Sequence, residues 1–271
     1  SGSGRPAVPE GDTVYRTARL LDQLRGEQLT RTDFRVPQHA TADLVGGTVA
    51  ETVSRGKHLL TRVDRGAEQW TLHTHLKMEG SWKVVRPRQR WPRSATNARV
   101  VLETARHTAI GFSLGIVELV DRAREDDVVG HLGPDLLGPD WDEAVALANL
   151  LHEPARPLRE ALLDQTNLAG VGNMYAAELC FTSGVHPETP VGAVPELPRL
   201  VRRAHQMLTL NKERWVQSTT GDLRERERMW VYRRDRSPCR RCGTPILVDM
   251  QGPAGRERAS YWCPACQPLR D

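Results

Sequence analysis

Four of the five cysteines fall into two closely spaced pairs near the end of the chain. Cys239 and Cys242 form one Cys-x-x-Cys pair, and Cys263 and Cys266 form a second pair after twenty intervening residues. Four thiolates at this spacing are typical of a closed, tetrahedral, structural Zn²⁺ site, one per chain. Two disulfides are the alternative, which fits poorly with a sequence that shows no secretory leader. Because a hairpin with a turn at 252–255 is expected between the pairs, we predict a zinc ribbon.

A proline and a carboxylate, Pro9 and Glu10, stand directly before the first expected helix. Apolar residues at helical spacing predict that helix over about 13–25. On one interpretation Asp12 is simply the N-cap of the helix, since its side chain can accept the first free N–H groups. On the other, Pro9 and Glu10 form a reaction centre. The residues alone favour the cap and leave both interpretations open.

Three further stretches have residue types that can contact a polyanion. Lys57 follows a plausible hairpin turn, and Met78 lies among polar residues in an expected loop. A Gly-rich turn at 169–172 precedes Asn173, where a new helix is expected to begin. The free N–H groups and dipole of that helix suit a phosphate, and the glycines would let a nucleic-acid backbone approach. Taken singly, these patterns are also typical of a surface lysine, a core methionine and an ordinary turn.

Length and charge restrict the class of protein. The 271 residues suit two domains, and the net charge of +4 is modest. No apolar run is long enough to span a bilayer, so we expect a cytoplasmic protein. Arginines cluster over 86–93 and 224–241, which indicates either a polyanionic partner or solvated charged faces. Cys180 lies in an apolar helical run and is expected to be a buried core residue.

The expected elements give an α+β fold. Short strand-like runs predict an N-terminal β-sandwich with a helix at one edge, spanning 9–132. Helical patterns follow over 133–225, and short strands return with the zinc ribbon at 226–271. The Gly/Ser-rich residues 1–8 are interpreted as an added segment outside the fold. The strands are expected at 48–54, 57–63, 69–75, 81–85, 98–104, 108–112 and 116–120, and the later helices at about 142–151, 157–165 and 198–210.

Together these pieces resemble the formamidopyrimidine-DNA glycosylase/endonuclease VIII family over essentially all of Pro9 to Gln267. The resemblance implies a β-sandwich domain, a helix–two-turn–helix DNA-binding domain and a zinc hairpin, in a monomer that binds damaged duplex DNA. The motifs that carry it are Pro9-Glu-Gly, Gly56-Lys57, His75-Leu-Lys-Met-Glu-Gly80, Leu163-Asp-Gln, Ala169-Gly-Val-Gly-Asn-Met-Tyr175, Gly184-Val-His-Pro187, and Val231-Tyr232 before the cysteines.

The resemblance implies a reaction centre at the first motif. The amine of Pro9 would attack C1′ of a damaged nucleotide and expel the base, and the resulting iminium would drive β,δ-elimination of the flanking phosphates. Glu10 would move protons at the sugar, and Lys57 would hold a phosphate or assist proton transfer at the base. In the printed sequence the nitrogen of Pro9 is an amide with Val8, which has no lone pair available for attack. Attack through Pro9 therefore requires removal of 1–8.

The resemblance also implies DNA contacts and a branch of the family. Asn173 and Arg258 would bind phosphates around the lesion, and Met78 would fill the gap left by a flipped nucleotide. The segments 11–13 and 111–114 depart from the pattern of members directed at 8-oxoguanine, which favours the endonuclease VIII branch. We therefore expect a bifunctional DNA glycosylase/AP lyase of base excision repair, acting on oxidised pyrimidines at the bacterial nucleoid.

Two other functions fit some of these residues. A non-catalytic protein that binds lesions or abasic DNA on the same fold would need neither Pro9, Glu10 nor Lys57. A zinc-ribbon transcription regulator would leave the N-terminal residues unexplained.

Overall fold

The computed structural model describes residues 8–269. These residues form two compact units. The sandwich unit is Thr13–His131, and the helical unit combines the chain from Leu132 onward with the residues up to Asp12. The first motif, Pro9-Glu10, thus belongs to the unit that contains the C-terminal half of the chain.

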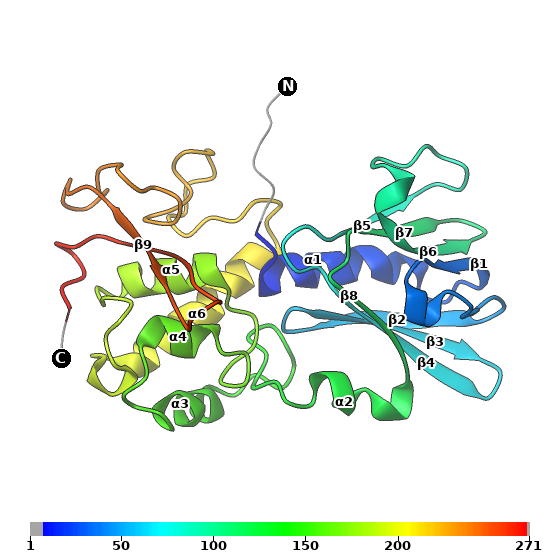
Figure 1. Cartoon of the computed structure of the whole chain (residues 1–271), viewed down its shortest axis with the longest axis horizontal. Coiled ribbons are helices and arrows are strands. Elements are labelled where there is room, and N and C mark those ends of the chain that lie inside the picture. Colours follow the sequence, from blue (N-terminus) through cyan, green and yellow to red (C-terminus); the bar gives the residue numbers. More distant parts are fainter. Residues whose placement is uncertain (1–7, 270–271) are drawn as a thin grey trace. The chain divides into compact units, whose positions relative to one another are not determined.

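The sandwich unit contains two antiparallel four-stranded sheets, with strand orders β1-β6-β7-β5 and β2-β3-β4-β8 (Figure 1). Alternating strand residues such as Val49, Leu59 and Val63 point inward and are fully buried, as expected for sheets with one face on a core. The strands are β1 (Leu29–Phe34), β2 (Thr48–Arg55), β3 (His58–Arg65), β4 (Glu68–His75), β5 (Ser81–Val85), β6 (Ala98–Thr104), β7 (Thr108–Phe112) and β8 (Ile116–Asp121). The short helix α2 (Asp126–Val129) follows β8.

Helix α1 (Gly11–Leu21) buries one face in the sandwich core. Val14, Ala18 and Leu21 recur at helical spacing and join the same apolar cluster as residues of both sheets. The helix begins at Gly11, so the prediction that Asp12 is its N-cap is wrong. Asp12 lies in the first turn, is fully buried, and its Oδ1 accepts a hydrogen bond from Nε2 of Gln217. The side chain of Asp12 is thus bound to a residue far along the chain, which the local sequence pattern does not reveal.

The helical unit is built from α3 (Glu143–Leu151), α4 (Leu158–Leu163), α5 (Asn173–Thr182) and α6 (Leu197–Lys212). Helix α5 lies in the middle of this unit, and every residue from Met174 to Phe181 is buried. The side chain of Asp142 caps α3 by accepting the N–H of Val145 at 3.1 Å. A helix buried on all sides has fixed neighbours at its start, and the candidate site is built there.

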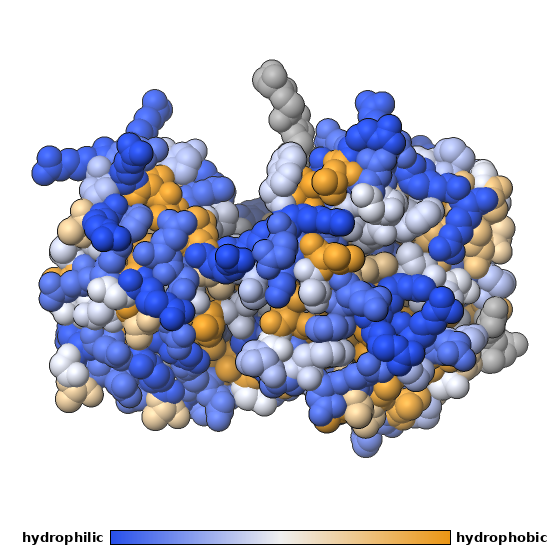
Figure 2. Space-filling model, turned by 180° about the vertical axis from the view of Figure 1, so that it is seen from behind, coloured by the Kyte–Doolittle hydropathy of each residue, from blue (hydrophilic) through white to orange (hydrophobic). Residues whose placement is uncertain are grey.

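The hairpin near the end of the chain pairs β9 (Leu247–Gln251) with β10 (Arg258–Trp262), and β10 contacts α5. The expected combination of β-sandwich, helical region and four-cysteine hairpin is confirmed. Among residues 8–269, none of the helices combines the length and the apolar character that a bilayer-spanning segment needs. Figure 2 shows hydrophilic residues over most of the visible face, interrupted by separate hydrophobic patches.

Candidate active site and metal centre

Glu10 is completely buried at the start of helix α5. Its carboxylate accepts N–H groups from Gly172 at 2.8 Å, Met174 at 2.7 Å and Tyr175 at 3.3 Å. These first N–H groups of a helix have no partner within the helix, and the helix dipole favours an anion there. The sequence predicted a phosphate at this position, and the structure instead supplies an internal carboxylate. Burial, followed by the charges of Asp12 and Glu10, raises the pKa of Tyr175 well above its usual range.

Two glycines allow the backbone before α1 to approach the turn before α5. The N–H of Gly11 donates to the carbonyl of Gly170 at 2.9 Å, and a Cβ added to Gly11 would lie 2.9 Å from the Cα of Gly170. Gly170 has a φ of 120°, which side chains disfavour. The amide of Gln165 fixes the turn, since Oε1 accepts the N–H of Gly170 and Nε2 donates to the carbonyl of Val171. Gly11 and Gly170 therefore allow two segments of the protein's own backbone to pack closely, and the approach of a nucleic-acid backbone to this turn stays a prediction.

Pro9 is half-buried, and both of its neighbours are held by the helical unit. The carbonyl of Val8 accepts a hydrogen bond from Nε2 of Gln217 at 3.3 Å, and the same Nε2 donates to Oδ1 of Asp12 at 3.1 Å. Glu10 is fixed by α5 on the other side. Pro9 therefore lies between two residues that are held in place, and the one that follows it carries a buried carboxylate, so a nucleophile and an acid/base group could be combined here.

The structure brings the two predicted phosphate-binding residues together. Asn173 is the first residue of α5, and its Nδ2 donates to the carbonyl of Ala259 at 2.8 Å. Arg258 immediately precedes Ala259 at the start of β10, and its side chain is exposed. An amide and a guanidinium thus lie on neighbouring elements of one unit, as a phosphate site would need.

Lys57 and Met78 belong to the sandwich unit. Lys57 lies in the two-residue turn between β2 and β3, one position before β3 begins, whereas the sequence predicted that the strand starts at Lys57 itself. Met78 lies in the turn between β4 and β5 and is 65% exposed. A methionine that is mostly exposed in a turn is not part of a core, so the core interpretation of Met78 is wrong.

The spacing of His73 and His75 allows a metal pair but favours ordinary strand residues, and it does not reveal the cluster that the two form with His58. Nδ1 of His73 donates to Oε2 of Glu118 at 2.8 Å, so Nε2 of His73 is left to accept from Nδ1 of His58 at 2.7 Å. Burial, followed by neighbouring histidines and Lys77, lowers the pKa of His58 to about 3. Burial, then Lys77, lowers the pKa of His75 to about 4. The alternation of histidines along β4, opposite His58 on β3, was the available signal.

The four cysteines of the hairpin form a compact thiol cluster. Their Sγ atoms all lie within 4.8 Å of one another, and the residues are free thiols. The N–H of Arg241 points to Sγ of Cys239 at 3.4 Å, and the N–H of Cys266 points to Sγ of Cys263 at 3.4 Å. Such N–H contacts stabilise thiolates, and an all-sulfur donor set suits a tetrahedral metal ion. Among residues 8–269, no other group of ligand atoms converges in this way.

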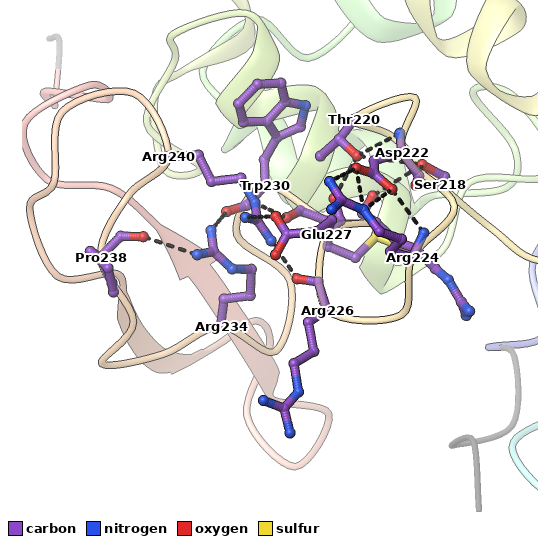
Figure 3. A network of polar contacts seen from close by, with 12 residues as sticks. Ser218, Thr220, Asp222, Arg224, Arg226, Glu227, Trp230, Arg234, Pro238 and Arg240 are labelled. Carbon is purple, nitrogen blue, oxygen red and sulfur yellow. Dashed lines mark hydrogen bonds and ion pairs between the residues drawn. The ribbon is translucent and has the colours of Figure 1, made fainter. Parts of the chain in front are cut away.

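The arginine cluster ahead of the cysteines is used largely within the fold. Arg224 pairs with Asp222, and Arg240 pairs with Glu227 (Figure 3). The guanidinium of Arg226 points away from this network in Figure 3. Much of the positive charge that suggested a polyanionic partner therefore fixes a loop, and only part of it is directed outward.

A cavity of about 870 Å³ lies beside this loop. Val8, Met174, Trp215, Arg226 and Tyr232 are among its lining residues. The side chain of Trp215 is 82% exposed. The cavity therefore lies next to the residue that precedes Pro9, and it offers aromatic and cationic groups together.

Comparisons with known proteins agree with this geometry. The formamidopyrimidine-DNA glycosylase N-terminal domain matches residues 8–113, and the formamidopyrimidine-DNA glycosylase H2TH domain matches residues 132–213. The chain is 53% identical to a "Probable endonuclease 8 2" of Streptomyces coelicolor, over 96% of this chain and 94% of that protein. It is 51% identical to the "DNA-(apurinic or apyrimidinic site) lyase Nei2" of Mycolicibacterium smegmatis, over 96% and 99%.

A solved structure shares the fold at lower identity. The Lactococcus lactis Fpg in complex with DNA that contains an oxidized pyrimidine superimposes with a TM-score of 0.79 at 24% identity, covering 96% of this chain and all of that one. The chain therefore belongs to the formamidopyrimidine-DNA glycosylase family, as an endonuclease VIII-like DNA glycosylase and AP lyase of base excision repair.

Proposed function

We propose that this enzyme works through a Schiff base on Pro9, with Glu10 as the acid/base group. The observation that carries the proposal is the buried carboxylate of Glu10, held by three backbone N–H groups directly beside the proline. The free secondary amine of Pro9 would attack C1′, the C1′–N bond to the base would break, and an iminium would form. Glu10 would transfer protons at the sugar during opening and elimination. This chemistry requires that the peptide bond between Val8 and Pro9 be cleaved first.

The substrate that we propose is duplex DNA carrying an oxidised pyrimidine or an abasic site. Asn173 and Arg258 would bind phosphates, and Lys57 would hold a phosphate or assist proton transfer at the base. Met78, exposed in its turn, would fill the gap in the duplex. We assign the cavity beside Val8 to the flipped nucleotide, since a base can stack on an aromatic side chain there.

We propose that one Zn²⁺ per chain is bound by Cys239, Cys242, Cys263 and Cys266, with a structural role. The metal would supply no chemistry at the sugar. It would fix the hairpin, and β10 then carries Arg258 next to Asn173. We further assign the enzyme to the bacterial nucleoid and regard the single chain as the working unit.

Borohydride trapping tests the mechanism. A chain that begins at Pro9 should form a covalent adduct with a duplex that contains an abasic site, because borohydride reduces the iminium to a stable amine. The matched control is the chain with Val8 retained, which should bind the same duplex and form no adduct. A lack of adduct from the free-proline chain would reject the proposal and favour the non-catalytic lesion-binding protein.

Removing the metal tests the assigned role of zinc. A chelator should release one Zn²⁺ per chain and weaken duplex binding by more than about tenfold, since the hairpin that carries Arg258 loses its fixed geometry. Strand content measured by circular dichroism should change little, because the sandwich unit holds no cysteine ligand. Full DNA affinity after verified loss of zinc would contradict this role.

A further inference from the structure

Arg159 is an arginine on α4 that lies almost entirely inside the protein. Only 3% of its surface is exposed. One terminal nitrogen, Nη2, donates to Oδ1 of Asn173, and the other, Nη1, donates to the backbone carbonyl of Gln251 at 3.3 Å. The Nε atom has no hydrogen-bond partner among the described residues. Neither the sequence motifs nor the proposed mechanism gives this side chain a role.

No carboxylate in the described part of the chain forms an ion pair with this buried guanidinium. The nearby carboxylates of Glu160 and Asp164 are both bound by Arg156. Burial lowers the pKa of Arg159 and is the largest cause of its shift; Cys180 acts against it, the charge of Arg258 lowers the pKa further, and Glu160 raises it. A buried charge without a partner of opposite sign lowers the stability of the fold, so we expect this arginine to have a function that offsets that loss.

The hydrogen bond from Arg159 to Asn173 suggests what that function is. An asparagine amide has an acceptor end, Oδ1, and a donor end, Nδ2, and it can rotate to exchange them. A guanidinium only donates, so Oδ1 must face Arg159. The NH₂ end must then face the other way, and one of its hydrogens is taken by the carbonyl of Ala259. The second hydrogen is left to donate to an acceptor such as a phosphate oxygen.

We propose that Arg159 is a positioning residue that fixes the amide of Asn173 with its NH₂ group toward a DNA phosphate, beside Arg258. This inference rests on the phosphate-binding role of Asn173 in the proposed function. The three residues come from α4, α5 and β10, so one hydrogen-bonded line joins the helices to the hairpin. A phosphate placed there would also neutralise the positive charge that Arg159 and Arg258 create together.

Two substitutions separate the positioning role from a structural one. Arg159→Lys keeps a donor-only group and should bind an abasic-site duplex within about threefold of the unchanged chain. Arg159→Gln has both a donor and an acceptor, so it no longer dictates the amide orientation, and affinity should fall about tenfold. The full chain with Val8 retained is the protein to use, because it binds without turnover. Melting temperatures of both variants report whether the fold survives.

A double-mutant cycle with Asn173→Ala gives the decisive readout. If Arg159 acts through Asn173, then Arg159→Gln should cause no further loss of affinity once Asn173 is replaced. Equal losses in both backgrounds would overturn the proposal, because a general electrostatic or structural effect does not depend on Asn173. Wild-type affinity of Asn173→Ala alone would reject both the phosphate role and the positioning role, while borohydride trapping would still report on Pro9 separately.

Discussion

Glu10 and Glu178 are both fully buried carboxylates at helix α5, and each accepts three or more hydrogen bonds from protein groups. Glu10 comes from outside the helix and binds its first N–H groups. Glu178 lies within the helix and accepts the N–H groups of residues 230–232 at 2.7, 2.9 and 2.8 Å. The same hydrogen-bonding chemistry thus holds a carboxylate beside the proposed nucleophile in one place and makes a purely structural contact in the other. What distinguishes them is the neighbouring residue, Pro9.

The donors of the two carboxylates differ as well. The N–H groups bound by Glu10 are the free ends of a helix, which water or another anion could also satisfy. Those bound by Glu178 belong to an irregular segment, and the same carboxylate also accepts a hydrogen bond from the hydroxyl of Thr219. Loss of Glu178 would therefore remove the acceptor that ties residues 230–232 to helix α5. Loss of Glu10 would leave the first N–H groups of α5 without their buried acceptor and would remove a charge next to Pro9 in the chain.

The substitution Glu10→Gln should give the largest effect on chemistry. In a chain that begins at Pro9, the neutral amide cannot move a proton at the sugar, and single-turnover excision of an oxidised pyrimidine should slow by about 10²–10⁴-fold. Adduct formation with a ready-made abasic site should persist, since the nucleophile is still Pro9. Excision at the unchanged rate would remove Glu10 from the catalytic machinery.

The matched substitution Glu178→Gln should act on stability. An amide presents N–H groups to backbone N–H groups, so the free energy of unfolding should fall by about 1–3 kcal/mol. Hydrogen exchange of the amides of residues 230–232 should accelerate. The single-turnover excision rate at saturating DNA should stay close to that of the unchanged chain. A rate loss comparable with that of Glu10→Gln would erase the distinction between the two carboxylates.

Low pH should destabilise the sandwich unit, because two of its histidines, His58 and His75, resist protonation in the folded state. The pKa values of His58 and His75 are lowered to about 3 and about 4, whereas the unfolded chain titrates near 6.5. Between the folded and the unfolded pKa values, the unfolded state binds more protons than the folded state. The contribution of the two histidines to the free energy of unfolding is therefore fully present above pH 6.5 and is lost as the pH falls toward 3. Lys57, Lys77, His73 and His131 interact with these two rings and belong to the same balance.

Denaturation monitored from pH 7 to pH 4 checks this smaller effect. The variant with both His58→Asn and His75→Asn keeps a polar atom near each Nδ1 position and removes the titration, so its unfolding free energy should depend less on pH. An unchanged pH dependence would show that other groups control the acid response of the unit.

Features that depend on near neighbours in the chain were predictable. The spacing of the cysteines is enough to predict their cluster, and alternating apolar residues predict most strands within one or two residues. Strand β1 was missed because its sequence, LTRTDF, buries only Leu29 and Phe34. It lies at the edge of its sheet, where the intervening polar residues remain in solvent.

The environment of the site depended on contacts between distant residues and could not be predicted. Glu10 and Gly172 are 162 positions apart, and no local pattern shows that one will bind the other. The Gly-rich turn was predicted from the sequence, but the close contact between Gly170 in this turn and Gly11 was not. The family resemblance pointed to Pro9 and Glu10, and the domain boundaries at 132/133 and 225/226 stay predictions.

The contact between the first motif and helix α5 also sets an order of events during synthesis. The sandwich unit, Thr13–His131, can complete its sheets as soon as its own residues have left the ribosome. Glu10 must wait for a partner 162 residues further along, which takes about 8–30 s at bacterial elongation rates. During that interval the N–H groups at the start of helix α5 that bind Glu10 are not yet present. The reaction centre proposed at Pro9 and Glu10 therefore cannot form until synthesis has passed α5, well after the sandwich unit is complete.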